Sequence, residues 1–210
     1  APIVTTLIII ACTLIFLHEL MLDEFSRDYF VSRYGVIPAH PRLVPLFTSM
    51  FLHGGWSHII GNMLFLWAFG KSLEDAMGHG KFLAFYLSCG VIAAVVQVAA
   101  NSYSRTPMVG ASGAIAGVMG AYLLKFPRSN IRTVVFIFVF VTTVDIPAAF
   151  ILVYWFVMQL FSGYGSIART QVMDVGVAWF AHIGGFLAGM VLVRMMGTRQ
   201  RYFPRRDIYW

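Results

Sequence analysis

Charged side chains are scarce in this sequence. Asp, Glu, Lys and Arg together make up 11% of its 210 residues, whereas hydrophobic residues make up 59%. Ordinary globular domains are about 25% charged and about 45–50% apolar, and a soluble core could not bury this excess of apolar side chains. The composition therefore excludes an ordinary soluble domain. It predicts one polytopic membrane domain over residues 1–210, with the lipid bilayer as its solvent.

Cysteines and acidic residues are also few. The two cysteines, Cys12 and Cys89, each lie in an apolar run, which favours small packing residues over a disulfide. Nine acidic residues stand against fifteen lysines and arginines, a formal net charge of +6. Because the cations lie at the ends of apolar runs, they indicate membrane topology and contacts with anionic lipid, and no nucleic-acid partner is expected.

Six apolar segments are candidates for membrane spans, which take about 20 helical residues each. The first lacks the basic start and the cleavage site of a signal peptide, so we expect a true span. The fifth is too long for one upright helix and is interrupted by Asp145 and Pro147, so we expect a kinked or strongly tilted helix. The expected spans are residues 3–22, 51–70, 82–100, 112–126, 131–161 and 172–196, followed by a basic C-terminal tail at 197–210.

The loops between these segments give an expected topology. Lysines and arginines concentrate after the second, fourth and sixth segments, and alternating helices place these three regions on one side of the membrane. The positive-inside rule makes that side cytoplasmic, together with both termini. The long connection at residues 23–55 mixes aromatic and charged residues with prolines, so we expect it to be ordered at the membrane interface.

Three polar residues within apolar segments lie at matching distances from a basic helix end. Counting forward to the next cation gives thirteen residues from Ser112, thirteen from His58 and twelve from His182. Each stretch is about 18–20 Å of helix, so the three groups are expected at one depth. A helix of that length does not cross a hydrocarbon core about 30 Å thick, so residues 101–107 are expected to enter the membrane beside a water-filled cavity.

Ser112 has the local features of a nucleophile, although the same features suit helix packing. It begins an apolar segment, where a backbone N–H has no intrahelical partner and can bind an anionic group. Gly110 and Gly113 leave room beside it for a peptide backbone. However, Ser112, Ala116 and Gly120 also form a small-residue ridge of the kind that packs helices in membranes. Taken alone, Ser112 therefore favours packing.

His182 supplies the base that a serine nucleophile needs. Gly185 and Gly189 give the last segment a second small-residue edge, so this segment can pack closely against the one that carries the serine. The imidazole can then accept the hydroxyl proton, whereas the plainer alternative is a histidine bonded to a backbone carbonyl. Asp174 lies about 12 Å along a helix from His182 and cannot orient the ring. The role of Asp145 stays open, and the pattern predicts a dyad.

His58 and Asn62 are spaced i, i+4 and therefore share one helical face. Both can donate hydrogen bonds near the depth of Ser112, so we expect an oxyanion hole made by these two side chains and the Ser112 N–H, each donor being worth about 2.7–4 kcal/mol. His53 is expected nearer the surface, bonded to loop backbone. A metal site built from His53, His58 and His182 is the rival, but the sequence has no His-Glu-x-x-His motif and no accompanying carboxylate. No metal is expected.

Three motifs resemble those of the rhomboid intramembrane serine proteases. Residues 110–113 are similar to the GxSG motif of that family and residues 181–185 to its AHxxG motif, while His53, His58 and Asn62 match HxxxxHxxxN. The motifs occur in the family's order, and the resemblance covers about residues 34–194. It implies an all-α membrane protein, a six-transmembrane-helix rhomboid-like bundle with a long loop between helices 1 and 2.

The resemblance also implies an activity. The chain would be an intramembrane serine endopeptidase that cleaves transmembrane segments of membrane proteins in the bilayer, without a cofactor. Substrates would enter past the fifth helix, and a loop at residues 162–171 would cap the cavity. The bacterial type of the family gives the bacterial inner membrane as the expected location. The residues involved would be Ser112 and His182 as catalytic dyad, His58, Asn62 and the Ser112 N–H as oxyanion hole, and His53, Gly110 and Gly113 as supporting residues.

Two other classes of function are weighed against this one. The fold could bind membrane proteins without cutting them, as a chaperone-like binder or an accessory subunit of a larger membrane complex. Labelling of Ser112 by a fluorophosphonate separates this alternative from a protease. A transporter or channel has less support, because paired broken helices and a charged pathway are not evident in the sequence.

Overall fold

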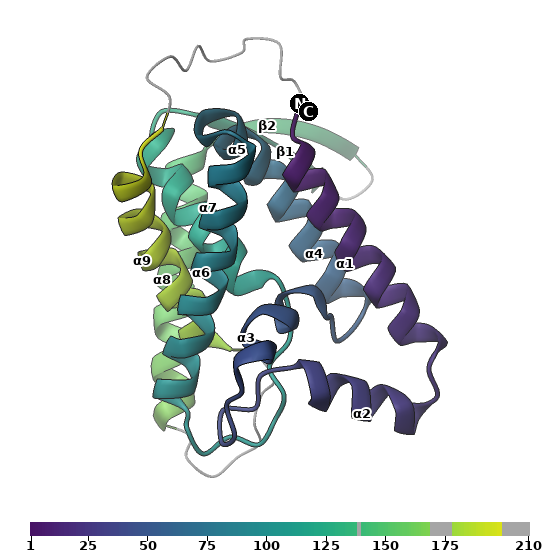
Figure 1. Ribbon diagram of the computed structural model, residues 1–210. Coiled ribbons are helices and arrows are strands. Elements are labelled where there is room, and N and C mark those ends of the chain that lie inside the picture. Colours follow the sequence, from purple (N-terminus) through teal and green to yellow (C-terminus); the bar gives the residue numbers. More distant parts are fainter. Residues whose placement is uncertain (138–139, 169–177, 199–210) are drawn as a thin grey trace.

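The computed structural model describes residues 1–137, 140–168 and 178–198 of the chain, and side chains at 135–140 and 166–168 are left aside. The architecture is a bundle of helices (Figure 1). In Figure 1, α6, α7, α8 and α9 lie close together, α1 and α4 stand beside them, and α2 and α3 lie at the end opposite the two strands. The main helices are α1 (Ile3–Met21), α4 (Trp56–Phe65), α5 (Lys71–Met77), α6 (His79–Ala100), α7 (Ser112–Lys125), α8 (Ala148–Ala168) and α9 (Trp179–Met196).

This mostly helical architecture agrees with the expected fold class. Within the described residues, α1, α6, α8 and α9 are long and apolar enough to cross a membrane. A turn of π-helix, η2 (Leu66–Gly70), joins α4 to α5 in one continuous helical run, since Leu66 and Lys71 both have right-handed helical dihedral angles. Helix α7 has only 14 residues, fewer than a full span takes. The count of six spans therefore stays a prediction.

The expectation of a single kinked helix at residues 131–161 is wrong. Strands β1 (Asn130–Ile137) and β2 (Phe140–Pro147) form an antiparallel hairpin, and α8 begins only at Ala148. β-branched residues dominate this stretch and favour strands. Arg132 is directly opposite Asp145 in the register, and its Nε donates to Asp145 Oδ1 at 3.0 Å. Pro147 stands at the end of β2, where its missing N–H does least harm.

Helices α7 and α9 pack backbone to backbone through glycines. A Cβ on Gly185 would lie 2.0 Å from the carbonyl oxygen of Gly113, and one on Gly189 would lie 1.9 Å from that of Gly117. A Cβ on Gly120 would lie 2.1 Å from the carbonyl oxygen of Phe186. Side chains larger than hydrogen would separate the two helices at each of these positions. The close packing of the last helix against the serine-bearing helix, expected from the sequence, is thus confirmed.

A buried carboxylate ties α1 to α5. Glu74 accepts hydrogen bonds from the backbone N–H groups of Val4 and Thr5, both at 2.8 Å, and from the Thr5 hydroxyl at 2.7 Å. His79 Nδ1 lies 2.5 Å from the same carboxylate. The negative charge thus meets the N-terminus of α1, where the unpaired N–H groups and the helix dipole favour an anion. The start of α1 is held by this one side chain.

The long connection at residues 23–55 is ordered, as expected, and largely helical. It contains α2 (Glu24–Tyr34), α3 (Leu43–Thr48) and the 3₁₀ turn η1 (Ser49–Phe51). Asp23 caps α2 by accepting from the Ser26 N–H at 2.9 Å and the Ser26 hydroxyl at 2.8 Å, and these bonds lower the pKa of its carboxyl. Arg42 donates to the carbonyl oxygens of Ser32 and Arg33 at the other end of α2. The large exposed apolar side chains here are Phe25, Tyr29, Leu43, Val44 and Phe47.

Candidate active site

An irregular chain leads from the end of α6 to the start of α7. Val36 and Met108 form an isolated bridge, each N–H donating to the other's carbonyl oxygen, at 3.0 and 2.7 Å. Gly110 donates its N–H to Ser49 O at 2.9 Å, and its φ of 124° lies in the region that favours glycine. This backbone pairing with the connection before α4 fixes where α7 begins. It places Ser112 as the first residue of that helix.

The structure brings Ser112 and His182 together. His182 Nε2 lies 2.8 Å from Ser112 Oγ, and the two residues come from α7 and α9. Because Ser112 opens its helix, its own backbone N–H has no intrahelical carbonyl to bind. A hydroxyl in contact with a basic nitrogen beside a free N–H is the arrangement that nucleophilic attack on a carbonyl requires. The glycine contacts between the two helices make this approach sterically accessible.

The other ring nitrogen of His182 has a partner that sequence reasoning missed. Gln159 of α8 lies with Oε1 2.8 Å from His182 Nδ1, and its Nε2 donates to Trp155 O at 3.2 Å. The Trp155 ring lies beside the imidazole, with 5.6 Å between the centroids. A carboxylate is the usual orienting group for such a histidine, and here a neutral amide takes that position. A lone glutamine in the apolar stretch of α8 was the available signal, because buried amides need partners.

His58 and Asn62 lie on α4 against the turn before Ser112. A Cβ on Gly110 would lie 2.6 Å from His58 Nε2 and 3.8 Å from Asn62 Nδ2, so both side chains face that turn. Asn62 Nδ2 donates to His58 O at 2.9 Å, and His58 Nδ1 accepts from the Gly54 N–H at 3.4 Å. Within the described residues, neither side chain makes a hydrogen bond to Ser112. Their role as oxyanion donors stays a prediction.

His53 is deeper than expected. Its side chain is fully buried and so does not lie nearer the surface, while its expected bond to loop backbone stays a prediction. Its ring instead packs edge-on against His58, with 5.3 Å between centroids. The sequence placed His53 by its distance along a helix, but α4 begins only at Trp56 and the preceding chain turns inward. His53 therefore supports the position of His58 by packing.

Gly113 is a packing position more than an open space. A Cβ there would lie 2.7 Å from Ala93 Cβ of α6, so the missing side chain allows α6 and α7 to approach. At Gly110 the missing side chain leaves room for the His58 ring, so the expected space for a substrate backbone stays a prediction. The described residues hold no group of three His, Cys, Asp or Glu side chains that could bind a metal ion. Asp174 lies outside the described residues, as do residues 169–171 of the expected cap and residues 199–210 of the tail. The remaining cap residues, 162–168, belong to α8 and do not form the expected loop, because the helix continues to Ala168.

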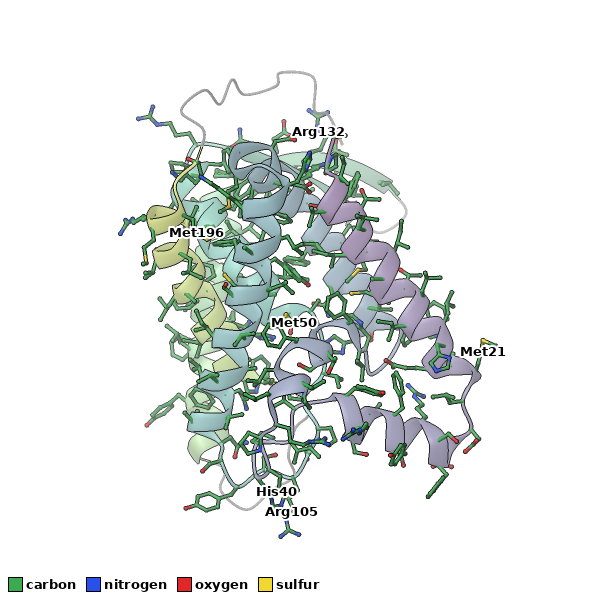
Figure 2. All side chains as sticks on the ribbon, in the orientation of Figure 1. Met21, His40, Met50, Arg105, Arg132 and Met196 are labelled. Carbon is green, nitrogen blue, oxygen red and sulfur yellow. The ribbon has the colours of Figure 1, made fainter. Side chains whose placement is uncertain are left out.

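A cavity of about 500 Å³ opens over the serine and the histidine. Figure 2 places Met50, one of its lining residues, between Arg132 near one end of the bundle and His40 and Arg105 near the other. Residues of the irregular stretch 101–107 line it, which agrees with the expected position of that stretch beside a cavity. Gln97 also faces it and accepts from the Ala181 N–H at 3.1 Å. The walls are mainly small or apolar residues.

The sequence matches a known domain and several characterised relatives. The Rhomboid domain family matches residues 40–199. Presenilin-associated rhomboid-like protein, mitochondrial, of Rattus norvegicus is 35% identical over 60% of this chain and 32% of the relative. Rhomboid protein 1, mitochondrial, of Saccharomyces cerevisiae is 31% identical over 58% of this chain and 33% of the relative. Rhomboid protease GluP of Bacillus subtilis is 31% identical over 72% of this chain and 26% of the relative.

These matches correct the expected location. The rat and yeast relatives are mitochondrial proteins by name, as are those of cow and mouse, so the expected bacterial inner membrane is overturned. The assignment of both termini to a cytoplasm falls with it. The error arose because the three motifs indicate the family and do not distinguish its bacterial from its mitochondrial members. The positive-inside rule does not help, since it indicates a side of a membrane and not which membrane it is. The chain spans about a third or less of the length of these relatives.

Proposed function

Because this chain belongs to the rhomboid family, we propose that it is an intramembrane serine endopeptidase that cleaves transmembrane segments of membrane proteins. The observation that carries the proposal is the 2.8 Å contact between Ser112 Oγ and His182 Nε2 inside a cavity between membrane-type helices. A serine is a weak nucleophile until a base can take its proton, and this contact supplies the base. The mitochondrial relatives support a mitochondrial membrane as its location.

The proposed reaction begins when Ser112 Oγ attacks the carbonyl carbon of the scissile peptide bond. His182 Nε2 takes the hydroxyl proton as the new C–O bond forms, and the carbonyl oxygen becomes an oxyanion. The C–N bond then breaks, and the imidazolium gives its proton to the leaving amine. Water from the cavity then attacks the resulting ester, again with His182 as base. The C–O bond to Ser112 breaks, the carboxylic acid product departs, and the imidazolium returns a proton to Ser112 Oγ.

The oxyanion is stabilised by three donors in this proposal. The N–H of Ser112 comes from the start of α7, and His58 and Asn62 face the same turn from α4. Asn62 must exchange its bond to His58 O for one to the substrate, since its Nδ2 donates to that carbonyl in the structure. Each such donor contributes about 2.7–4 kcal/mol to transition-state stabilisation in comparable hydrolases.

The membrane setting defines the substrate class. Exposed apolar side chains cover α1, α6, α8 and α9, so a substrate helix reaches the cavity from the lipid. Among these four helices, α8 has the smallest buried share and lies directly beside His182, which favours entry past α8. A stable helix hides its carbonyl groups, so cleavage is expected where the substrate has small or helix-breaking residues.

The test uses the purified protein in proteoliposomes with a reporter transmembrane segment that contains glycine and small residues. Ser112→Ala and His182→Asn are expected to abolish cleavage and to prevent labelling by a fluorophosphonate. Ser57→Ala, at an exposed serine of α4, is the matched control and should retain both. Full cleavage by Ser112→Ala would refute the proposal. A folded wild-type protein that neither cleaves nor labels would instead favour the binding role without proteolysis.

A further inference from the structure

We propose that Gln159 is a positioning residue that fixes the tautomer and the orientation of His182. This inference rests on the proposed proteolytic function and assigns a third member to a site that the sequence presented as a dyad. Gln159 Oε1 lies 2.8 Å from His182 Nδ1, and the opposite ring nitrogen lies 2.8 Å from Ser112 Oγ. The serine, the imidazole and the amide therefore form one chain of contacts from α7 through α9 to α8.

The hydrogen bond between Gln159 and Trp155 determines which ring nitrogen of His182 carries the proton. Gln159 Nε2 donates to the carbonyl oxygen of Trp155, one helical turn earlier in α8. Rotating the amide by 180° would place two oxygens against each other, so this carbonyl holds Oε1 towards the imidazole. An amide oxygen only accepts, so His182 Nδ1 must carry the ring proton in the neutral state. Nε2 is then free to accept the hydroxyl hydrogen of Ser112, as a general base must.

The surroundings keep this contact in place. Gln159 is only 6% exposed, so water does not compete readily for its oxygen. The Trp155 ring lies 5.6 Å from the imidazole and 6.3 Å from the Phe186 ring, and it limits the rotation of the histidine. Trp155 and Gln159 are spaced i, i+4, so both lie on the face of α8 that contacts His182. One helix thus supplies both the acceptor and the packing surface.

A neutral amide suits a site within a membrane better than a carboxylate does. A charged side chain in the bilayer interior is costly unless it is paired, and the resting dyad carries no positive charge for a carboxylate to balance. The amide orients the ring without that cost. Because the acceptor belongs to α8, which has the smallest buried share of the four span candidates, the contact between Gln159 and His182 exists only while α8 lies against α9.

Two variants of Gln159 and one control test this role. Gln159→Met keeps the length of the side chain and removes the acceptor, so kcat for the reporter segment should fall about 10- to 100-fold while KM stays nearly constant. Gln159→Glu keeps an acceptor and adds a charge that stabilises imidazolium, so it should retain more activity and move the acid limb of the pH–rate profile to higher pH. Tyr154→Phe, at an exposed position of α8, is expected to match wild type.

A measurement without catalysis separates this inference from the proposed function. In Ser112→Ala protein labelled with ¹⁵N-histidine, the His182 signals should report a proton on Nδ1, and adding Gln159→Met should give a mixture of tautomers. His182→Asn identifies the signals. A wild type that neither cleaves nor labels refutes the proteolytic function and leaves this spectrum interpretable. Gln159→Met with wild-type kcat, or with an unchanged His182 tautomer, would overturn the positioning role.

Discussion

A Cβ atom on Gly189 of α9 would lie 1.9 Å from the carbonyl oxygen of Gly117 on α7. Neighbouring glycines repeat the relationship, so the two helices approach to backbone contact along this edge. That separation decides whether the imidazole on α9 can reach the hydroxyl on α7. The packing of small residues is thus a condition for the chemistry of the site as well as for the stability of the bundle.

The first prediction concerns this edge. Gly189→Ala should force α7 and α9 apart, because the contacting atom is backbone and cannot rotate away. We expect a loss of about 1–3 kcal/mol in the free energy of unfolding, with slower fluorophosphonate labelling of Ser112. Gly80→Ala is the matched control, since nothing lies within 4 Å of a Cβ there. Thermal denaturation in detergent measures the first effect, and a Gly189→Ala midpoint equal to that of Gly80→Ala would contradict it.

The second prediction concerns the carboxylate that holds the start of α1. Burial opposes ionisation of Glu74, but hydrogen bonds from Thr5, Val4 and His79 outweigh it and hold the pKa below its ordinary value. A depressed pKa in the folded state means that the ionised group stabilises the fold above pH 4.5, the ordinary value, and that this stability is lost as pH falls through the lower folded pKa. The denaturation midpoint should therefore drop in acid below pH 4.5.

Variants of Glu74 separate its charge from its hydrogen bonds. Glu74→Ala leaves the N–H groups of Val4 and Thr5 without their acceptor and should cost about 1–3 kcal/mol of unfolding free energy. Glu74→Gln keeps one acceptor oxygen and should lose less, while flattening the acid dependence. Asp75→Asn, at the exposed neighbouring acid, is the control. An acid profile in Glu74→Gln as steep as that of wild type would assign the acid dependence to another group.

The third prediction concerns the turn that carries the serine. Gly110→Ala would place a Cβ 2.6 Å from His58 Nε2 at a residue whose φ is +124°, so both the backbone and the imidazole must shift. We expect kcat to fall by about 10²-fold, as when one oxyanion donor is removed. Gly54→Ala adds its Cβ 3.8 Å from the Nδ1 of the same imidazole, an ordinary contact, and should remain near wild type. Equal kcat values for the two variants would show that His58 is not part of the oxyanion hole.

The close packing of α9 against α7 could be predicted from the sequence, because the spacing of small residues along a helix indicates where a second helix can approach it closely. The GxxxG-type edge on the last segment required a partner helix, and the shared depth of Ser112 and His182 indicated which helix that is. The contact of His182 with Ser112 could therefore be predicted from the sequence. The ordered state of the connection at 23–55 was likewise readable from its aromatic and proline content.

The parts that sequence reasoning missed depend on contacts between distant residues. The stretch 130–147 is apolar enough for a helix, although its β-branched residues favour strands. The pairing of Arg132 with Asp145 across the two strands, which the sequence does not reveal, establishes the hairpin. The same pairing occupies the aspartate that had stayed open as a third member of the site. Gln159 was missed because its role depends on α8 lying against α9, a relationship that no spacing along one segment reports.

The last prediction tests whether substrates enter past α8. A Cβ on Gly163 of α8 would lie 3.6 Å from Trp179 Cβ of α9, within the range of about 3.5–4.5 Å found in disulfides. Gly163→Cys combined with Trp179→Cys should therefore form a bond that fixes α8 against α9. When oxidised, this variant should cleave the reporter segment at least about tenfold more slowly, and reduction should restore its rate.

Labelling of Ser112 by a small fluorophosphonate should persist in both states, because the probe does not need α8 to move. The single variants, treated with the same oxidant, control for the loss of each native residue, and the native Cys12 and Cys89 are buried. If the oxidised double variant cleaves as fast as the reduced one, the substrate reaches the cavity by another route, and the contact between α8 and α9 can remain closed throughout the reaction.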